Sequence, residues 1–128
     1  MSKYKLIVEK NKDGYWSQVE QLPGVFSSGD SIPNLIENSK EAIELYYEET
    51  DRQVKNIEFE LVMDIQEFFK ANEFINITSL AKRIGMNSSL LRQYSKGIKF
   101  PSIEQVARIE KEIKQIGREL SNTRLQPV

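Results

Sequence analysis

The stretch from residue 76 to residue 102 constrains the fold of this chain more than any other part of it. Asn76 is a good N-cap for a helix over residues 77–84. Gly85 can end that helix, because glycine readily adopts the left-handed conformation. A second short helix, about 88–96, follows at once. The spacing therefore predicts two short helices joined by a tight turn.

This pair has the sequence pattern of a helix-turn-helix, whose second helix lies in the major groove of DNA. Arginine can bind guanine and glutamine can bind adenine, so the polar side chains of the second helix are candidate base-reading residues. They are Ser88, Ser89, Arg92, Gln93 and Lys96. Three further cations, Lys82, Arg83 and Lys99, are placed to contact phosphates. The alternative is the ordinary polar face of a small helical domain.

Charge divides the chain into two parts with different expected partners. Residues 1–63 carry 12 acidic and seven basic side chains, whereas residues 64–128 carry seven acidic and 11 basic ones. An acidic part favours a basic partner, and a basic part favours an anion such as DNA. We therefore expect two domains, 1–63 and 64–128. Two merely solvated surfaces remain the simpler alternative.

The first domain has the pattern of a small α+β fold. The expected order is β-β-β-α-β, with the helix on one face of the sheet, over residues 4–9, 15–20, 25–28, 33–50 and 55–62. The second domain is expected to be all-α. It opens with a short helix from residue 64 and ends with a long one over about 102–120.

Two features of the first domain are candidates for binding a basic protein. The first is a row of glutamates on the outer face of the helix, namely Glu37, Glu41, Glu44 and Glu48, whose negative charge could face a basic surface. Trp16 is a candidate anchor, because aromatic residues are enriched at the centres of interfaces. The alternatives are a solvated helix face for the glutamates and a core position for Trp16.

The composition excludes several kinds of chemistry. The chain has no cysteine and no histidine, so disulfides, the usual zinc sites and an imidazole base are absent. Its carboxylates form no pattern typical of two-metal catalysis. We therefore expect no cofactor, no metal and no enzymatic activity. No apolar run suggests a signal peptide or a membrane span, so we expect a cytoplasmic protein.

The first domain resembles the HicB-type antitoxins. The resemblance spans about residues 4–63 and rests on three ordered motifs, Asp13-Gly14-Tyr15-Trp16, Leu22-Pro23-Gly24 and Gly29-Asp30-Ser31. It implies a partial RNase H-like fold. It also implies that this domain binds a small basic mRNA-cleaving toxin of HicA type and covers its active site.

The second domain is similar to the Xre/Cro-type repressors. The similarity rests on Leu80-Ala81-Lys-Arg-Ile-Gly85 and on the ending Gly97-Ile-Lys-Phe-Pro101-Ser102. One departure is Asn76-Ile77, which stands where that family often has Thr-Gln. The similarity implies five short helices and binding as a dimer to a two-fold related site. The apolar face of the long helix is compatible with a homodimer or higher oligomer formed through this domain.

The sequence thus predicts an antitoxin of a type II toxin–antitoxin pair that neutralises its toxin and represses its own operon by binding operator DNA. Two alternatives belong to other functional classes. One is a stand-alone helix-turn-helix regulator whose first domain senses a small ligand in an apolar pocket. The other is a metal-dependent nuclease of RNase H type, which would need a cluster of carboxylates.

Overall fold

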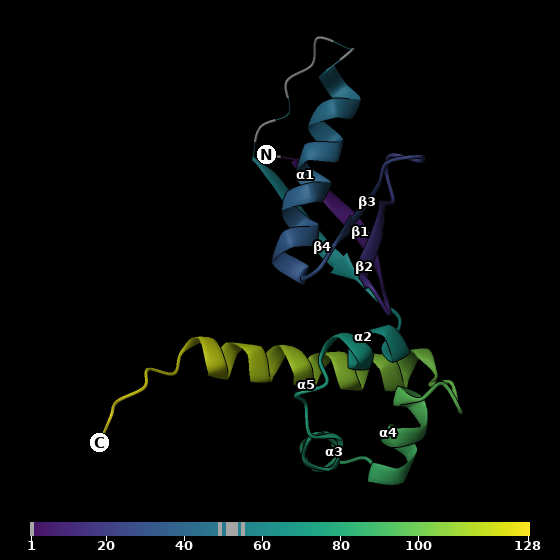
Figure 1. Ribbon diagram of the computed structural model, residues 1–128. Helices are drawn as coiled ribbons and strands as arrows, with labels where there is room; N and C mark the ends of the chain where they lie inside the picture. Colours follow the sequence, from purple (N-terminus) through teal and green to yellow (C-terminus); the bar gives the residue numbers. More distant parts are fainter. Residues whose placement is uncertain (1, 49, 51–53, 55) are drawn as a thin grey trace. The chain divides into compact units, whose positions relative to one another are not determined.

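The computed structural model describes residues 2–48, 50, 54 and 56–128 (Figure 1). The chain divides into two compact units, Met1–Ala71 and Asn72–Val128, and each is described by itself. The first unit is α+β with a four-stranded sheet, as expected, and the second unit contains helices only. In the described part of the chain, no helix combines the length and the apolar character needed to cross a membrane.

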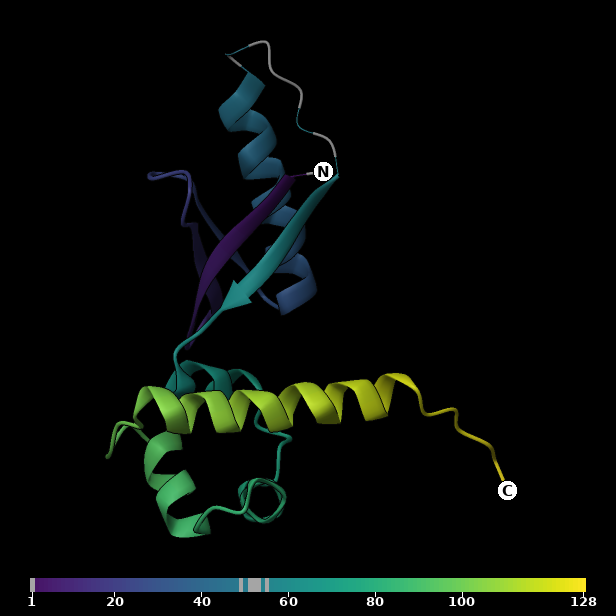
Figure 2. The same cartoon turned by 180° about the vertical axis from the view of Figure 1, so that it is seen from behind.

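The first unit follows the expected β-β-β-α-β order and adds one helix. Its elements are β1 (Ser2–Asn11), β2 (Gly14–Val19), β3 (Phe26–Gly29), α1 (Ile32–Glu48), β4 (Ile57–Val62) and α2 (Ile65–Ala71). The strand order is β3-β2-β1-β4. β1 pairs antiparallel with β2 and parallel with β4, and β2 pairs antiparallel with β3. Figure 2 shows β1 and β4 side by side, with α1 behind them on one face of the sheet.

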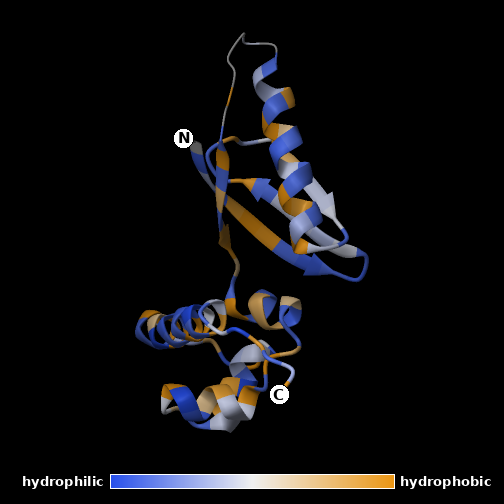
Figure 3. Ribbon diagram, turned by 90° about the vertical axis from the view of Figure 1, so that its left-hand side faces the viewer, coloured by the Kyte–Doolittle hydropathy of each residue, from blue (hydrophilic) through white to orange (hydrophobic). Residues whose placement is uncertain are grey.

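The core of this unit lies between the sheet and α1. Alternate residues of β1 and β2 point toward the helix, and the apolar stripe of α1 packs on them. In Figure 3, hydrophilic and hydrophobic segments follow each other along the ribbon of α1, as expected for a helix with one polar and one apolar face. The fully buried members of this layer are Leu6, Val8, Ser17, Leu35, Ser39 and Ile43. The hydroxyls of Ser17 and Ser39 lie 3.2 Å apart and hydrogen-bond each other.

The start of α1 is fixed by local contacts with the end of β3. Ser31 caps the helix, because its Oγ accepts a hydrogen bond from the backbone N–H of Asn34 at 3.1 Å. Gly29 sits so close to the helix that a Cβ there would lie 2.6 Å from the backbone nitrogen of Leu35. Only glycine therefore allows β3 and α1 to approach this closely.

Helix α2 belongs to the first unit, whereas the expected domain boundary lies between residues 63 and 64. The backbone N–H of Lys10, near the end of β1, donates to Oε2 of Glu67 on α2 at 2.7 Å. Asp64 caps α2 by accepting from the backbone N–H of Glu67. The compact unit thus extends to Ala71.

The second unit contains α3 (Ile77–Ile84), α4 (Ser88–Ser95) and α5 (Ile103–Ser121). Their N-caps are Asn76, Asn87 and Ser102, and each side chain accepts a hydrogen bond from a backbone N–H three residues later. Gly85 ends α3 in the left-handed conformation with φ of +79°. The predicted pair of short helices joined at Gly85 is therefore present.

The core of the second unit is small. It consists of Leu80 and Ala81 from α3, Leu91 and Tyr94 from α4, and Ile109 from α5. The predicted apolar face of α5 is only partly buried, since Ile103 is 89% exposed and Leu120 is 65% exposed. The contacts of α3 with α5 thus leave these two side chains exposed.

Candidate functional site

The exposed face of α4 presents a strip of polar side chains. Ser89, Arg92 and Lys96 are exposed, and their spacing of three and four residues places them on one side of the helix. Leu91 and Tyr94 are buried and hold the opposite side against the core. The other two predicted base-reading residues, Ser88 and Gln93, are half-buried.

Arg92 is oriented by a residue of α3. Its Nη2 donates a hydrogen bond to Oγ1 of Thr78 at 3.1 Å. A guanidinium has five N–H donors in a planar fork, so this single bond leaves others for a ligand. The contact restricts a long side chain that would otherwise have many rotamers, and it was not predicted from the sequence.

The three cations expected to contact phosphates are all exposed, but one of them, Arg83, is paired with carboxylates. Lys82 and Lys99 are exposed. The guanidinium of Arg83 forms ion pairs with two carboxylates of α5, to Glu112 at 2.9 Å and to Glu119 at 2.6 Å. These contacts raise the pKa of Arg83, and the hydrogen bond from Arg83 is the main cause of a lowered pKa of Glu119. Arg83 therefore joins α3 to α5 rather than offering an unpaired charge.

A second arginine, Arg108, also connects α3 and α5, but it belongs to α5 and donates to the backbone of α3. Nη2 of Arg108 on α5 donates to the backbone oxygen of Ile84 at 3.1 Å and to that of Gly85 at 3.4 Å. These carbonyl groups lie at the C-terminal end of α3, where a cation is favourable. The contacts of Arg83 and Arg108 thus hold α3 against α5. Because the turn at Gly85 connects α3 to α4, they also influence how α4 is placed.

The glutamates expected to bind a basic partner lie along the outer side of α1. Glu37, Glu41, Glu44 and Glu48 are all exposed, whereas Leu35, Ser39 and Ile43 are buried against the sheet. The row is interrupted by one cation, Lys40, which is also exposed. The helix therefore presents a predominantly negative surface on the side away from the sheet.

Trp16 lies on the opposite side of the unit from these glutamates. It is 36% exposed and stacks on Phe26, which is 50% exposed, with ring centroids 5.3 Å apart and planes inclined by 20°. Ser17, the next residue, points to α1, so Trp16 points to the face of the sheet away from that helix. The predicted toxin-binding residues thus form two separate surfaces, one on each side of the unit.

Comparison with protein families matches residues 4–124 to the family described as HicB-like antitoxin of bacterial toxin–antitoxin systems. The chain belongs to this family. The match covers both compact units, so the family assignment applies to nearly the whole HicB-like chain and not to its sheet alone.

Two relatives are similar in sequence to part of this HicB-like chain. A UPF0150 protein of Archaeoglobus fulgidus is 41% identical over 58 residues, which are 44% of the chain and 83% of the relative. An uncharacterized 14.9 kDa protein in the rep-hol intergenic region of Haemophilus phage HP1 is 42% identical over 45 residues. That match covers 35% of the chain and 34% of the phage protein.

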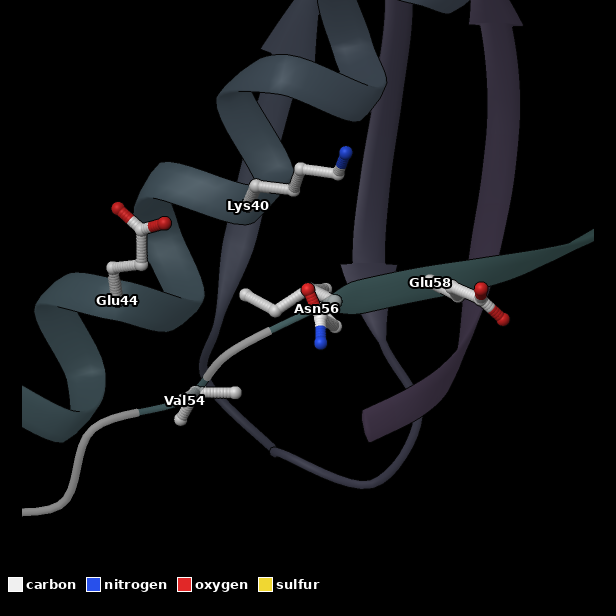
Figure 4. Close-up of a pocket in the computed structure, with 6 residues that line it drawn as sticks. Lys40, Glu44, Val54, Asn56 and Glu58 are labelled. Carbon is white, nitrogen blue, oxygen red and sulfur yellow. The ribbon is translucent and has the colours of Figure 1, made fainter. Parts of the chain in front are cut away.

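The first unit also contains an open depression of about 470 Å³ between α1 and the start of β4. Its lining residues are Lys40, Glu44, Val54, Asn56, Ile57 and Glu58. Figure 4 shows the charged ends of Lys40, Glu44 and Glu58 pointing in different directions rather than converging on one point. A ligand-sensing pocket is expected to be enclosed and mostly apolar, with convergent polar groups, so this depression does not favour a sensing function.

The described residues also offer little for metal chemistry. Among them, no three side chains of Asp, Glu, His or Cys gather where they could hold a metal ion. The structure therefore contains, in its described part, nothing that favours the nuclease alternative over a binding function.

Proposed function

We propose that this HicB-like antitoxin binds and neutralises a small basic mRNA-cleaving toxin of HicA type through its first unit, which we assign to a partial RNase H-like fold. The family match over residues 4–124 is the observation that carries this proposal. The excess of acidic side chains in residues 1–63 supports it, since a toxin that grips RNA must present positive charge.

The second part of the proposal concerns DNA. We propose that α3 and α4 are a helix-turn-helix of Xre/Cro type and that α4 enters the major groove of operator DNA. The exposed strip of Ser89, Arg92 and Lys96 supports this assignment, as does the excess of basic side chains in residues 64–128. In this proposal the chain binds DNA as a homodimer, or a higher oligomer, formed through the second unit, and represses its own operon.

Cleavage of mRNA belongs to the partner in this proposal, and the antitoxin itself is not an enzyme. Its site of action is the cytoplasm, where both the toxin's mRNA targets and the operator are found. Neither function requires a cofactor or a metal ion.

The test first asks whether a reading frame next to that of this chain encodes a small basic protein, and then reconstitutes the chain with that neighbouring protein. We expect the two proteins to co-purify and the mRNA cleavage by the partner to stop at equimolar antitoxin. We also expect the antitoxin to shift a duplex that contains its own promoter but not a scrambled duplex of the same length. No binding to the neighbouring protein at micromolar concentration would contradict the first part, and equal shifts of both duplexes would contradict the second.

A further inference from the structure

We propose that the toxin docks on the open face of the sheet, centred on Trp16 and Phe26, and that an arginine side chain of the toxin lies over the Trp16 ring beside Glu9. This inference rests on the proposed function and selects one of the two candidate surfaces. In it, the glutamates of α1 attract the toxin from a distance but do not form the centre of the contact.

The first argument is the exposure of a stacked aromatic pair. Phe74 and Phe100 are more exposed than Trp16 and Phe26, so exposure alone does not distinguish this pair; Trp16 and Phe26 stand out because their exposed rings stack on each other. Aromatic residues are enriched at interface centres. The stacking of Trp16 on Phe26, at 5.3 Å between centroids, fixes both rings before a partner arrives. A rigid aromatic platform loses little conformational entropy on binding.

The second argument is the chemistry that surrounds the pair. In the sheet register, Glu9 on β1 is directly opposite Trp16, and Ser28 on β3 is its other neighbour. Residues opposite each other in a sheet point to the same face, so the Glu9 carboxylate borders the indole ring. An aromatic face next to a carboxylate is a combination that binds a guanidinium, through cation–π contact and charged hydrogen bonds.

The third argument is the balance of charge on this face. The two lysines that β1 presents there, Lys3 and Lys5, are opposite Glu58 and Glu60 of β4 in the register. Glu9 lies beyond the last residue pair of β1 and β4, and it forms no ion pair among the described residues. The charge that remains unbalanced next to Trp16 is therefore negative, which fits a basic partner.

The surface of α1 has the opposite character. α1 exposes Leu45 and Tyr46 as well, but the ring contact between Tyr46 and Tyr47 is edge-to-face and is not a stacked platform. The glutamates of α1 carry their charge on exposed, flexible side chains. Such charges raise the rate of association and are screened by salt, whereas buried aromatic anchors control the rate of dissociation. The two surfaces can therefore be distinguished by kinetics.

The experiment measures association and dissociation rates of the full-length antitoxin with the basic protein encoded by the neighbouring reading frame, at low and high salt. We expect Trp16→Ala to raise the dissociation rate by roughly 30-fold or more, as hot-spot residues do, and Trp16→Phe to restore most of the affinity. We expect the fourfold variant of Glu37, Glu41, Glu44 and Glu48 to Gln to slow association by about tenfold at low salt and to change dissociation little. Phe74→Ala removes another exposed aromatic ring and serves as the matched control.

The arginine is tested with a double-mutant cycle. Each arginine of the toxin is changed to lysine, alone and together with Glu9→Gln in the antitoxin. We expect one of these arginines to lose affinity non-additively with Glu9→Gln, because the two residues share one contact. Additive effects for every arginine would overturn the role of Glu9.

Two other outcomes have separate meanings. If Trp16→Ala and Phe26→Ala leave the dissociation rate unchanged while the fourfold α1 variant raises it, the toxin docks on α1 and the inference is wrong. If the wild-type antitoxin does not bind the neighbouring protein at all, the proposed function fails instead. Far-UV circular dichroism of each variant shows that the compared proteins are folded.

Discussion

Arg83 and Arg92 lie on the two neighbouring short helices α3 and α4 but are held by different kinds of partner. Arg83 is paired with two carboxylates of α5, whereas Arg92 makes a neutral hydrogen bond to Thr78. Two neighbouring carboxylates offset the positive charge of a guanidinium and occupy several of its N–H donors, so it attracts a phosphate or a base only weakly. A guanidinium held by one hydroxyl keeps its charge and gains a preferred orientation. Residue type alone does not distinguish these two roles, because the difference arises from the neighbours: two carboxylates of α5 lie beside Arg83, whereas Thr78 of α3 lies beside Arg92.

The first prediction concerns base reading by α4. We expect Arg92→Ala and Gln93→Ala each to lower the affinity for the operator by about 1–3 kcal/mol, with a smaller effect on a scrambled duplex. Quantitative gel shifts at fixed salt measure both affinities. Lys111→Ala, an exposed cation of α5, is the control. Unchanged affinity for both α4 variants would place the reading surface elsewhere.

The second prediction concerns phosphate contact by Lys82. We expect Lys82→Ala to weaken binding to the operator and to a scrambled duplex alike, because a phosphate contact carries no sequence information. The slope of log affinity against log salt should decrease by about 1, since one fewer counterion is released. Gel shifts over a salt series measure this slope. A loss confined to the operator would show that Lys82 reads a base.

The third prediction concerns acid stability. The hydrogen bond from Arg83 lowers the pKa of Glu119 in the folded protein. A carboxylate with a lowered pKa stabilises the fold above its unfolded pKa of about 4.3, and this contribution is lost as the pH falls through the lowered folded pKa. We expect Glu119→Gln to melt below the wild type near neutral pH and the difference to disappear as the pH falls through the lowered folded pKa of Glu119.

Thermal melts of the full chain, followed by circular dichroism over a pH series, measure this difference. Glu73→Gln removes an exposed glutamate of the same unit and is the matched control. A difference between wild type and Glu119→Gln that persisted unchanged into acid would show that the ion pair is not its cause.

The elements of this fold differ in how far local sequence determines them. The helices begin at Asn76, Asn87 and Ser102, and end near glycine or the last apolar residue, so their limits were predictable from capping residues and periodicity. The parallel pairing of β1 with β4 was not predictable, because nothing local links residues so far apart in the chain. The face on which Trp16 lies depends on that sheet and on α1, and could be decided only in three dimensions.

The fourth prediction concerns the contact between β3 and α1. We expect Gly29→Ala to destabilise the first unit by about 1–3 kcal/mol, because the new methyl group would overlap the backbone of Leu35. Gly117→Ala on α5 should have the opposite sign, a gain of up to about 1 kcal/mol, since no atom lies within 4 Å of the added Cβ. Trp16 is the single tryptophan of the chain, so its fluorescence during urea unfolding reports on the first unit and measures Gly29→Ala, whereas far-UV circular dichroism, which includes α5, measures Gly117→Ala. Equal stability of Gly29→Ala and wild type would show that β3 can shift without cost.

At the scale of the whole molecule, the chain has two compact units of opposite charge character. The charge difference and the order of the elements were visible in the sequence. The limit between the units was less predictable, since α2 follows the sheet in the chain yet contacts β1 through Glu67. The candidate surfaces were predicted as sets of residues, but their division over two sides of the first unit depends on the tertiary fold.

The fifth prediction is that the two proposed functions can be removed separately. We expect Trp16→Ala to lose protection against the toxin in a growth assay while it still shifts the operator duplex. We expect Arg92→Ala to show the reverse, because each substitution lies in a different compact unit. Loss of both functions in either variant, with the fold intact by circular dichroism, would show that the two units act as one.

The parallel contact between β1 and β4 has a consequence for how the protein is made. Residues 2–7 pair with residues 57–62, so β1 is synthesised well before the strand with which it pairs in parallel. Contacts between such distant segments form slowly, because a long chain must close before they contribute. A nascent chain that stops before Ile57 has β1 with one of its edges unpaired. The sheet of the first unit can therefore be completed only after this segment has been translated.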